Sequence, residues 1–438
     1  MKKIALCLAL VSLLALSGSA FAEIGTIDDV PAATLLLPYF EVDLGNPNGI
    51  TTLFSINNAS ASAAVAHVVF WTDESIPTLD FDVYLSGYDV QTINVRDIFN
   101  GHLPITADAG SDPKDTISPK GSLSQDINFP GSTGPCGSAS TVYSDPALSS
   151  TLIDHLRRSH TGLSSPLFNN RCAGAVYGDN IARGYITVDS VTTCNLSFPS
   201  DAGYFTSFAD RRNILWGDYF YVNPGENFAA GETLVHVEAC STPSVGNGAG
   251  LCPFVTGDYT FYGRYAGAAD QREPLATTFA TRYVNGGAFD GGTDLLVWRD
   301  SKVGNPQAFV CGSNASWFPL AQTDVVAFDE QEHPTNLCFQ GDNVSPATGG
   351  TETCFPLETE RIHVAGGNVI AADLNPPSPF GWLYLNLNHS IVGDPFPGVA
   401  QAWVTTAMSA EGRYEVGYDA IQLDNASATV PGGVILIP

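Results

Sequence analysis

Residues 68–78 read VVFWTDESIPT, and residues 325–335 read VVAFDEQEHPT. The two stretches align without a gap, each with an apolar run first and a Pro-Thr pair at its end. Three further matches follow the same order along the chain: residues 51–56 with 293–298, residues 184–189 with 381–386, and residues 231–238 with 417–424. Self-similarity of this kind is the signature of a repeated unit. The sequence therefore predicts an internal duplication that gives two related β-domains in tandem.

Strand-like runs dominate both predicted repeats. Alternating or β-branched and aromatic stretches are separated by clusters of Gly, Pro and Asn, which are turn formers. Such runs predict an all-β fold of two tandem antiparallel β-sandwiches with a general immunoglobulin-like pattern. The expected strands lie near 33–42, 51–57, 64–71, 80–85, 91–96, 183–189, 217–222 and 232–238 in the first repeat, and near 276–284, 293–299, 323–329, 355–363, 368–373, 380–387, 400–407 and 413–423 in the second.

The repeats also set the expected domain boundaries. Residues 23–241 form the first sandwich, residues 276–438 form the second, and residues 242–275 join them as a disulfide-stapled linker. An insertion at about residues 100–182 of the first domain has no counterpart in the second. Insertions of that length tend to be functional or disordered, so we expect function in the segments without counterparts.

One helix is predicted inside this insertion. Asp145 is a candidate N-cap, Pro146 suits the first helical turn, and Gly162 ends the run. Apolar residues recur between them at helical spacing, at Leu148, Leu152, Ile153 and Leu156. The insertion is expected to be tied down by disulfides.

The first 22 residues predict a secretory signal peptide. Lys2 and Lys3 precede an apolar run, 4–16, that is too short to cross a bilayer, and residues 20–22 read Ala-Phe-Ala, a small-x-small cleavage site. We expect an exported bacterial protein located in the periplasm, on the outer surface or outside the cell. No transmembrane segment is expected after the signal is removed.

The cysteines fit an exported protein. Of nine cysteines, Cys7 leaves with the signal. An even number in an exported chain predicts disulfides, and the absence of any C-x-x-C pair argues against zinc. The remaining cysteines are Cys136, Cys172, Cys194, Cys240, Cys252, Cys311, Cys338 and Cys354. Spacing favours Cys240–Cys252 as a local bridge, then Cys136–Cys172 and a pair among Cys311, Cys338 and Cys354. Cys194 has no obvious partner.

The chain is strongly acidic, with a formal net charge of −27. Such a surface repels nucleic acid and anionic lipid, so no nucleic-acid partner is expected. Charged residues nevertheless make up only 14% of the chain against 44% hydrophobic residues. This composition predicts a folded protein with a core rather than a disordered acidic tail.

Calcium is the one cofactor for which the residues form a pattern. The turn after the first strand carries Asp43 and Asn48 in the first repeat, and its counterpart carries Asp290 and Asp294. Oxygen-rich loops that contain Gly suit a hard cation such as Ca²⁺. The same residue types are also ordinary turn formers, so both interpretations stay open. No other cofactor is expected.

The tryptophans divide into two groups. Trp216 and Trp317 lie in loop-like stretches, where an indole could stack on a sugar. The others lie within strand patterns and are expected in the core: Trp71, Trp298, Trp382 and Trp403.

Acidic residues cluster at one strand end of each repeat. In the second repeat they are Asp324, Asp329, Glu330 and Glu332, beside His333, and the first repeat carries Asp73 and Glu74 in the matching loop. A glycosidase needs two carboxylates facing a cleft. A loop that is acidic in both repeats fits a solvated strand end better.

The sequence contains none of the short catalytic motifs G-x-S-x-G, H-E-x-x-H or a glycine-rich phosphate loop. We therefore expect a non-enzymatic structural, adhesive, surface or matrix protein that self-associates or binds a surface polymer or glycan. Two alternatives remain: a secreted enzyme acting on polysaccharide, and a calcium-stabilised carbohydrate-binding protein.

Overall fold

A computed structural model of the 438-residue chain describes residues 30–104, 148–240, 259–266, 270–338, 353–389 and 400–424. The predicted signal peptide, 1–22, lies outside these ranges. Within them, no helix combines the length and the apolar character needed to cross a membrane.

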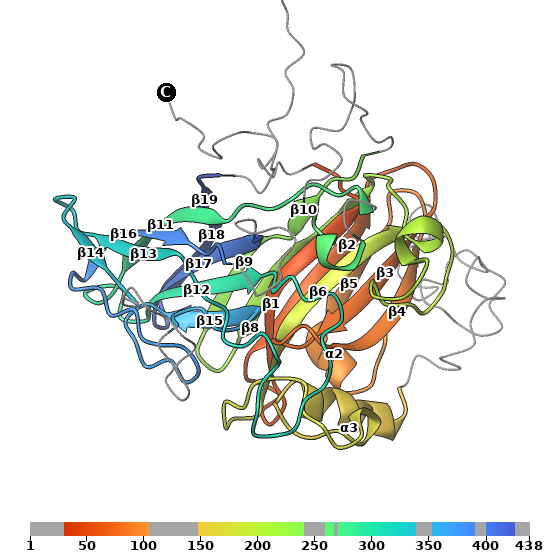
Figure 1. The fold of residues 1–438 in the computed structure, drawn as a ribbon, viewed down its shortest axis with the longest axis horizontal. Coiled ribbons are helices and arrows are strands. Elements are labelled where there is room, and N and C mark those ends of the chain that lie inside the picture. The colour runs from red at the N-terminus through yellow and green to blue at the C-terminus, as the bar shows by residue number, and fades with distance from the viewer. Residues whose placement is uncertain are drawn as a thin grey trace, which may run out of the picture.

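The described residues are mostly β-strand and form four antiparallel sheets, two in each half of the chain (Figure 1). In the first half, the β1 sheet has the strand order β10-β1-β6-β3-β4. The β2 sheet has the order β5-β2-β8-β9, with β7 also paired to β2. The strands are β1 Thr34–Asp43, β2 Thr51–Asn58, β3 Ala64–Trp71, β4 Pro77–Leu85, β5 Val90–Asn94, β6 Ile181–Val191, β7 Leu215–Trp216, β8 Asp218–Asn223, β9 Phe228–Thr233 and β10 Val235–Val237.

In the second half, the β11 sheet has the order β14-β13-β16-β11-β19, and the β12 sheet has the order β15-β12-β17-β18. The strands are β11 Thr278–Val284, β12 Gly292–Arg299, β13 Asp324–Phe328, β14 Pro334–Asn336, β15 Thr359–His363, β16 Phe380–Asn386, β17 Ala402–Ala410, β18 Tyr414–Asp419 and β19 Ile421–Gln422. The prediction of a β-rich antiparallel fold is therefore confirmed.

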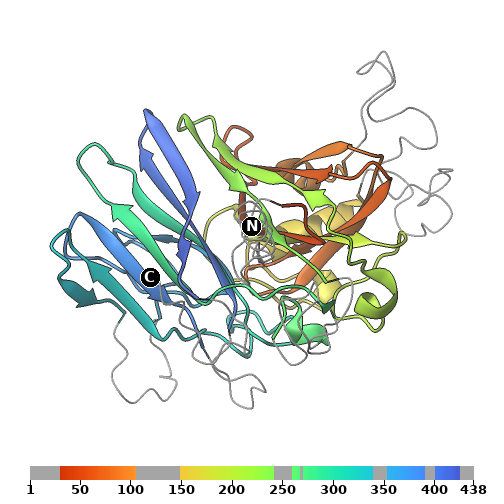
Figure 2. The ribbon, with the colours of Figure 1, turned by 90° about the horizontal axis from the view of Figure 1, so that it is seen from above.

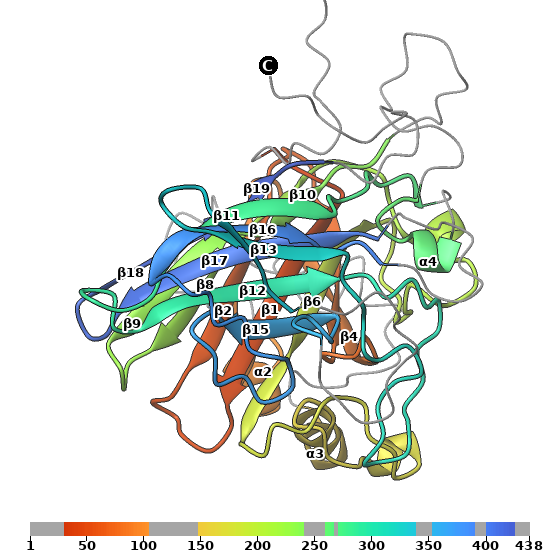
Figure 3. The same cartoon turned by 60° about the vertical axis from the view of Figure 1, so that its left-hand side comes forward.

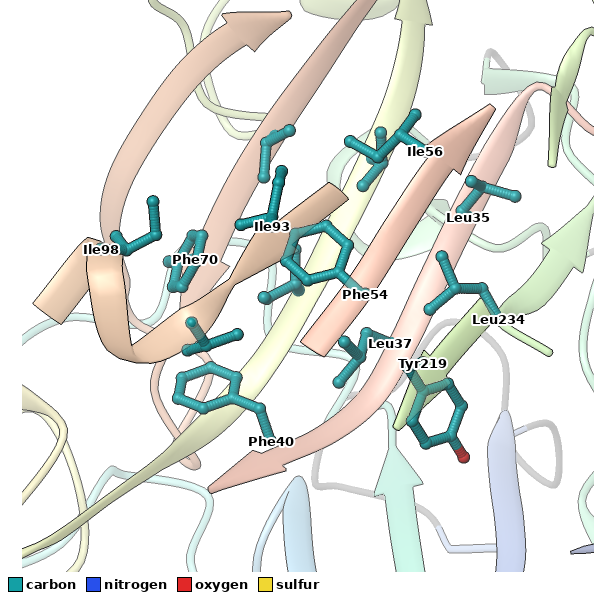
Figure 4. Close-up of a cluster of buried hydrophobic side chains, with 14 of the residues drawn as sticks. Leu35, Leu37, Phe40, Phe54, Ile56, Phe70, Ile93, Ile98, Tyr219 and Leu234 are labelled. Atoms are coloured by element: carbon teal, nitrogen blue, oxygen red, sulfur yellow. The ribbon is translucent and has the colours of Figure 1, made fainter. Parts of the chain in front are cut away.

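Each half encloses its own apolar core between its two sheets. Alternate residues of a strand point to opposite faces, so Leu35 and Leu37 on β1 face Phe54 and Ile56 on β2 (Figure 4). In the second half, Leu295 and Val297 of β12 share a core with Phe279 of β11. Each half is thus a sandwich-like pair of sheets.

The two halves have matching strand order and largely matching register. In the first half, a cross-strand row runs Val235–Leu36–Thr187–Val69. In the second half, the row runs Ile421–Ala280–Tyr384–Val326. The sequence matches at 68–78, 184–189 and 231–238 align Val69 with Val326, Thr187 with Tyr384 and Val235 with Ile421. Each aligned pair therefore occupies the same place in its row.

The match of 51–56 with 293–298 is one residue out of register. Phe220 and Ala407 lie opposite the matched glycines Gly231 and Gly417, respectively. Phe220 pairs with Leu53, whereas Ala407 pairs with Asp294 rather than Leu295. Side chains alternate between the two faces of a strand, so a shift of one residue makes two aligned residues point to opposite faces of their sheets.

The β12 sheet joins the two halves by covering one side of the first sandwich. Leu296 packs into the first-half core, and the Tyr219 hydroxyl donates a hydrogen bond to Thr405 Oγ1 at 3.3 Å. Arg361 on β15 pairs with Glu41 on β1 at 2.5 Å. The two halves therefore share contacts along β1, β6, β12 and β15, and they lie side by side in Figure 2.

The helices differ in part from the prediction. Helix α3 spans Ser150–Ser159, and its N-cap is Ser149, whose side chain accepts a hydrogen bond from the Leu152 amide. The predicted N-terminal residues Asp145 and Pro146 lie outside the described residues. Two short helices, α2 Val95–Phe99 and α4 Gly263–Ala266, were not predicted. α2 replaces the end of the predicted strand 91–96 because the Asn94 side chain caps a helix there.

The predicted strand at 368–373 is wrong. The Asp373 carboxylate accepts hydrogen bonds from the amides of Gly367 and Asn368, which closes this segment into a turn. Alternating residues alone cannot reveal such a side-chain contact.

Two disulfides link described cysteines. Cys338 bonds to Cys354, which confirms a pair among the last three cysteines. Cys172 bonds to Cys311, so the predicted Cys136–Cys172 bridge is wrong. The backbone of Cys172 pairs with that of Phe309, which brings the first-half insertion against the second half. Cys194 and Cys240 are also disulfide-bonded. Cys136 and Cys252 lie outside the described residues, so the Cys240–Cys252 bridge stays a prediction.

Candidate functional site at the junction of the two halves

The turn between β3 and β4, residues 72–76, is buried in the junction. Asp73, Glu74 and Ser75 are each at most 3% exposed. The Asp73 carbonyl accepts hydrogen bonds from the amides of Glu358 and Thr359 in the second half, at 3.2 and 3.3 Å. The expectation of a solvated strand end is therefore wrong for this turn.

Side chains of the same turn also bind the second half. Glu74 Oε2 accepts a hydrogen bond from the Ala315 amide at 2.6 Å. The Ser75 hydroxyl contacts the Tyr185 hydroxyl at 2.7 Å and donates to the Glu358 carboxylate. Main-chain and side-chain groups of one short turn thus fix its position against the other half.

Arg264 is the cation at the centre of this junction. Its guanidinium binds both Glu358 carboxylate oxygens, at 2.8 and 2.7 Å, and its Nε lies 2.9 Å from Asp300 Oδ1. The arginine side chain is 3% exposed, and both carboxylates are fully buried. A bidentate pair of this kind is specific in geometry, and removing one partner of a buried pair is costly.

Three further carboxyl groups at the junction have raised pKa values. Burial raises the pKa of Asp73 to about 7. Burial and then the neighbouring Asp73 raise the pKa of Glu74 well above its usual range. Burial likewise raises the pKa of Glu360. Because their pKa values are raised in the folded state, these groups hold their protons to a higher pH than they would in the unfolded chain.

Such a cluster is better suited to joining the halves than to catalysis. A general acid must reach a proton acceptor on the substrate. Glu74 is fully buried, and its Oε2 is already bound to the main chain of the second half. The raised pKa values therefore follow from a closed interface rather than from a substrate cleft.

A second buried polar group crosses the β1 sheet. Asp82, His67, Asp189 and Thr34 are cross-strand neighbours on four adjacent strands. His67 Nδ1 lies 2.7 Å from Asp82 Oδ1, and its Nε2 lies 2.8 Å from the Ser197 carbonyl. This row lies beneath the loop that follows β6, and the partners of His67 hold its ring in place. It is a structural network.

The four calcium candidates make contacts with protein groups. Asp43 Oδ1 accepts from the amides of Gly45 and Asn46, and the Asn48 amide donates to the Asn46 side chain. Asp290 pairs with Arg413 at 2.8 Å, whereas Asp294 is bound by Arg361 and His363.

In the first of these turns a guanidinium takes the central position. Arg96 donates to the carbonyls of Asp43, Asn46, Gly49 and Ile50 at 2.6 to 2.8 Å. Among the described residues, no group of three or more His, Cys, Asp or Glu side chains is arranged to hold a metal ion. Calcium binding stays a prediction from the sequence.

The two tryptophan candidates lie in different surroundings. Trp216 is half-buried on β7, with its ring 5.9 Å from that of His236. Trp317 is only 8% exposed and packs in a small cluster with Cys172 and Phe309. The described structure does not bring them into one cluster. Trp71, Trp298 and Trp403 are buried as predicted, but Trp382 is only half-buried, so its assignment to the core is wrong.

The acidic strand end of the second half is solvated, as expected. Asp329 accepts from the amides of Gln331 and His333 and contacts the His333 ring at 2.9 Å. Glu330 pairs with Arg282 at the surface. These contacts lower the pKa of Asp329, first through the His333 amide, whereas a glycosidase acid requires a raised pKa.

No family model, curated protein or solved structure matches the chain. The junction was missed by sequence reasoning because its groups come from residues 72–76, 264, 300 and 358–360. The sequence signal was the pair Asp73 and Glu74, which follow the mostly apolar strand β3 after a single residue, Thr72.

Proposed function

We propose that the protein is an exported, non-enzymatic structural or adhesive protein whose two sandwich halves act as one rigid scaffold. The observation that carries this proposal is the burial of residues 72–76 against the second half. Arg264, from the segment between the halves, lies between Glu358 and Asp300 of the second half, and Glu358 also accepts a hydrogen bond from Ser75 of the first half. Groups that could perform chemistry are engaged in holding the scaffold together.

The scaffold would have arisen by duplication of one immunoglobulin-like unit. The equal strand orders and the matching register rows support this origin. The pairs β2–β5 and β3–β6, and β12–β15 and β13–β16, correspond to the B–E and C–F pairs of an immunoglobulin sandwich. In an immunoglobulin sandwich, strand A pairs with B and strand G pairs with F. Here β1, in the position of A, pairs with β6, and β8, in the position of G, pairs with β2, so these two strands lie in opposite sheets relative to that fold.

Export is supported by the leader-like first 22 residues and by the disulfides. Cys172–Cys311 spans 139 residues and ties the first-half insertion to the second half. Disulfides persist in oxidising compartments and are rare in the cytosol. These observations support a location in the periplasm, on the outer surface or in the medium.

The test is to purify the mature, oxidised chain and to study it by light scattering and negative-stain electron microscopy. A structural protein should form a defined oligomer, sheets or filaments, and an adhesive one should sediment with isolated envelope polymers. In parallel, fractionation of the source cells should find the chain outside the cytoplasm. A monomer found in the cytoplasm would contradict the proposal. So would a chain that hydrolyses a polysaccharide catalytically, with repeated turnover.

A further inference from the structure

The outer face of the β11 sheet carries a row of aromatic side chains. Leu383 and Leu385 of β16 point into the second-half core, so Phe380, Trp382 and Tyr384 point to the opposite face. Phe380 is 49% exposed, and the other two rings are half-buried. Figure 1 places this sheet at the left, on the side away from most of the first-half strands.

Neighbouring strands extend this apolar surface. Trp382 lies between Arg282 on β11 and Phe328 on β13, and Tyr384 lies between Ala280 and Val326. The Arg282 guanidinium lies over the Trp382 ring, 4.5 Å from its centroid, and pairs with Glu330 at the surface. Ile421, on the edge strand β19, is 55% exposed beside Ala280. A sheet face turned to water normally carries polar residues, and a contiguous apolar patch marks an interaction surface.

The equivalent face of the first half shows what covers a surface of this kind. The register rows equate Trp71 with Phe328 and Tyr185 with Trp382. Both first-half residues are buried, in one cluster with Phe261, Tyr262 and Tyr265. The Tyr265 ring stacks on Trp71 with centroids 6.1 Å apart. This segment therefore covers part of the first-half face. The loop after β6, with Phe205, and the second half, with Trp298 and Trp403, add further rings to the same cluster.

The same segment also places a cation at one end of that face. Thr34 and Asp189 pair there across β1 and β6, and Arg272 reaches both, with a guanidinium nitrogen 3.4 Å from Asp189. The Tyr262 hydroxyl donates to Asp189 at 2.9 Å. The aromatic rings of the segment thus pack on the apolar part of the face, and its arginine pairs with the carboxylate at the end of the face.

The corresponding end of the second-half face is also acidic. Thr278 and Asn386 occupy the positions of Thr34 and Asp189 and pair across β11 and β16. Asp324 lies opposite Asn386 and is exposed, and half-buried Asp424 accepts a hydrogen bond from Thr278 at 2.7 Å. The backbone amides and hydroxyls of Thr277 and Thr278 already bind Asp424, so a positive group would complement the exposed Asp324.

We infer that the open face of the β11 sheet docks a segment of another protein that carries aromatic side chains and an arginine. This inference names the partner of the proposed scaffold and rests on that proposal. A neutral glycan would leave the acidic end without a cation.

The test uses a synthetic peptide with the sequence of residues 259–275, labelled with fluorescein, and the full oxidised chain. This peptide carries Phe261, Tyr262, Tyr265 and Arg272, which form one part of the cover of the first-half face. Fluorescence anisotropy should show saturable binding. Trp382→Ser and Asp324→Lys in the chain, and Arg272→Glu in the peptide, should each weaken binding at least tenfold. The matched control is Phe220→Ser, which removes a ring that is 46% exposed on the β2 sheet and should change affinity less than twofold.

Several outcomes would overturn the inference. One is binding of a scrambled peptide as tight as that of the original, and another is unchanged binding in a Trp382→Ser chain that circular dichroism shows to be folded. A chain that ignores the peptide but binds cello- or chito-oligosaccharides through Trp382 has a glycan face instead. Concentration-dependent dimerisation abolished by Trp382→Ser would make the face a self-association surface. Failure here is separable from failure of the scaffold proposal, because cell fractionation and hydrolase assays do not depend on the peptide.

Discussion

Gly231 and Gly417 lie against each other where strands β9 and β18 of the two halves approach. A Cβ atom built on Gly417 would lie 3.2 Å from the Gly231 carbonyl oxygen and 3.7 Å from its amide nitrogen. The two glycines occupy matched positions in the two halves. Figure 3 shows β9 and β18 side by side. A side chain at position 417 would press on the β9 backbone, so Gly417 permits the close approach of the halves. A Cβ atom on Gly231 would instead meet Phe220 and Tyr219 of the neighbouring strand β8.

Replacing Gly417 should therefore weaken the junction. Gly417→Val places a branched side chain against the β9 backbone, and we expect a loss of about 1–3 kcal/mol in the free energy of unfolding. Urea denaturation followed by tryptophan fluorescence measures this loss. Ala229→Val, which introduces the same valine side chain at an exposed position of β9, is the control and should be nearly neutral. Equal stability of the two variants would show that the strands do not meet at this point.

Arg264 tests whether the buried charges hold the halves together. Arg264→Met retains much of the side-chain volume but leaves the Glu358 and Asp300 carboxylates without their cation. Breaking a buried pair in this way costs about 3–5 kcal/mol. Arg413→Met removes an arginine that is half exposed beside Asp290, and surface pairs contribute at most about 1 kcal/mol. The melting temperature should fall by several degrees more in Arg264→Met than in Arg413→Met. A similar small fall in the melting temperature of both variants would mean that the Arg264 pairs contribute little to stability.

The strand pattern could be predicted because it is local. In Thr51–Asn58 and Phe380–Asn386 the alternation of residues is visible within one strand, and most expected strands overlap observed ones. The second-half turn at 329–333 is solvated, as its acidic residues indicate. The equivalent turn at 72–76 has a similar composition but is buried, because the second half covers it. The sequence of a loop shows how polar the loop is, but whether the loop is buried depends on what packs against it.

Trp382 and Cys172 illustrate the same limit. A tryptophan within an alternating strand is usually a core residue, and Trp71 and Trp298 follow that rule. Trp382 lies on the outer face of the β11 sheet. The equivalent face of the β1 sheet in the first half is covered, but this one is open. The partner of Cys172 is 139 residues away, and sequence spacing favours short loops. The Cys172 error concerns a contact between the halves, and the Trp382 error concerns a cover that the second repeat lacks, so neither is encoded in one strand.

Asp73 should make stability depend on pH near neutrality. Burial raises its folded-state pKa to about 7 from an ordinary 3.8, so between these values the folded state holds a proton that the unfolded state has lost. The free energy of unfolding should therefore fall as pH rises from about 4 to about 7, by up to about 1.4 kcal/mol per pH unit. Asp73→Asn keeps a side-chain acceptor for the Ala175 amide and cannot ionise. It should flatten this slope.

The measurement compares urea unfolding at pH 5 and pH 7 in both proteins. Buried His155 and His160, whose pKa values fall to about 4 and about 3, act in the opposite direction below pH 6.5. Their contribution cancels in the difference between the two proteins. Asp179→Asn is the control, because contact with Arg183 lowers the Asp179 pKa and its ionisation is complete in this range. An unchanged slope in Asp73→Asn would mean that this carboxyl is solvated.

The Cys172–Cys311 bridge should contribute more stability than Cys338–Cys354. The first closes a loop with a sequence separation of 139 residues and the second one of 16. In the chain-entropy model, a longer loop restricts the unfolded chain more, and the expected contributions are roughly 5 and 3 kcal/mol. Paired Cys-to-Ser variants of each bridge, unfolded in urea under oxidising conditions, measure the difference. Mass spectrometry of proteolytic fragments should find the Cys172 and Cys311 peptides joined. Cys172 joined to Cys136, or a larger loss from removing Cys338–Cys354, would contradict this account of how the halves are tied.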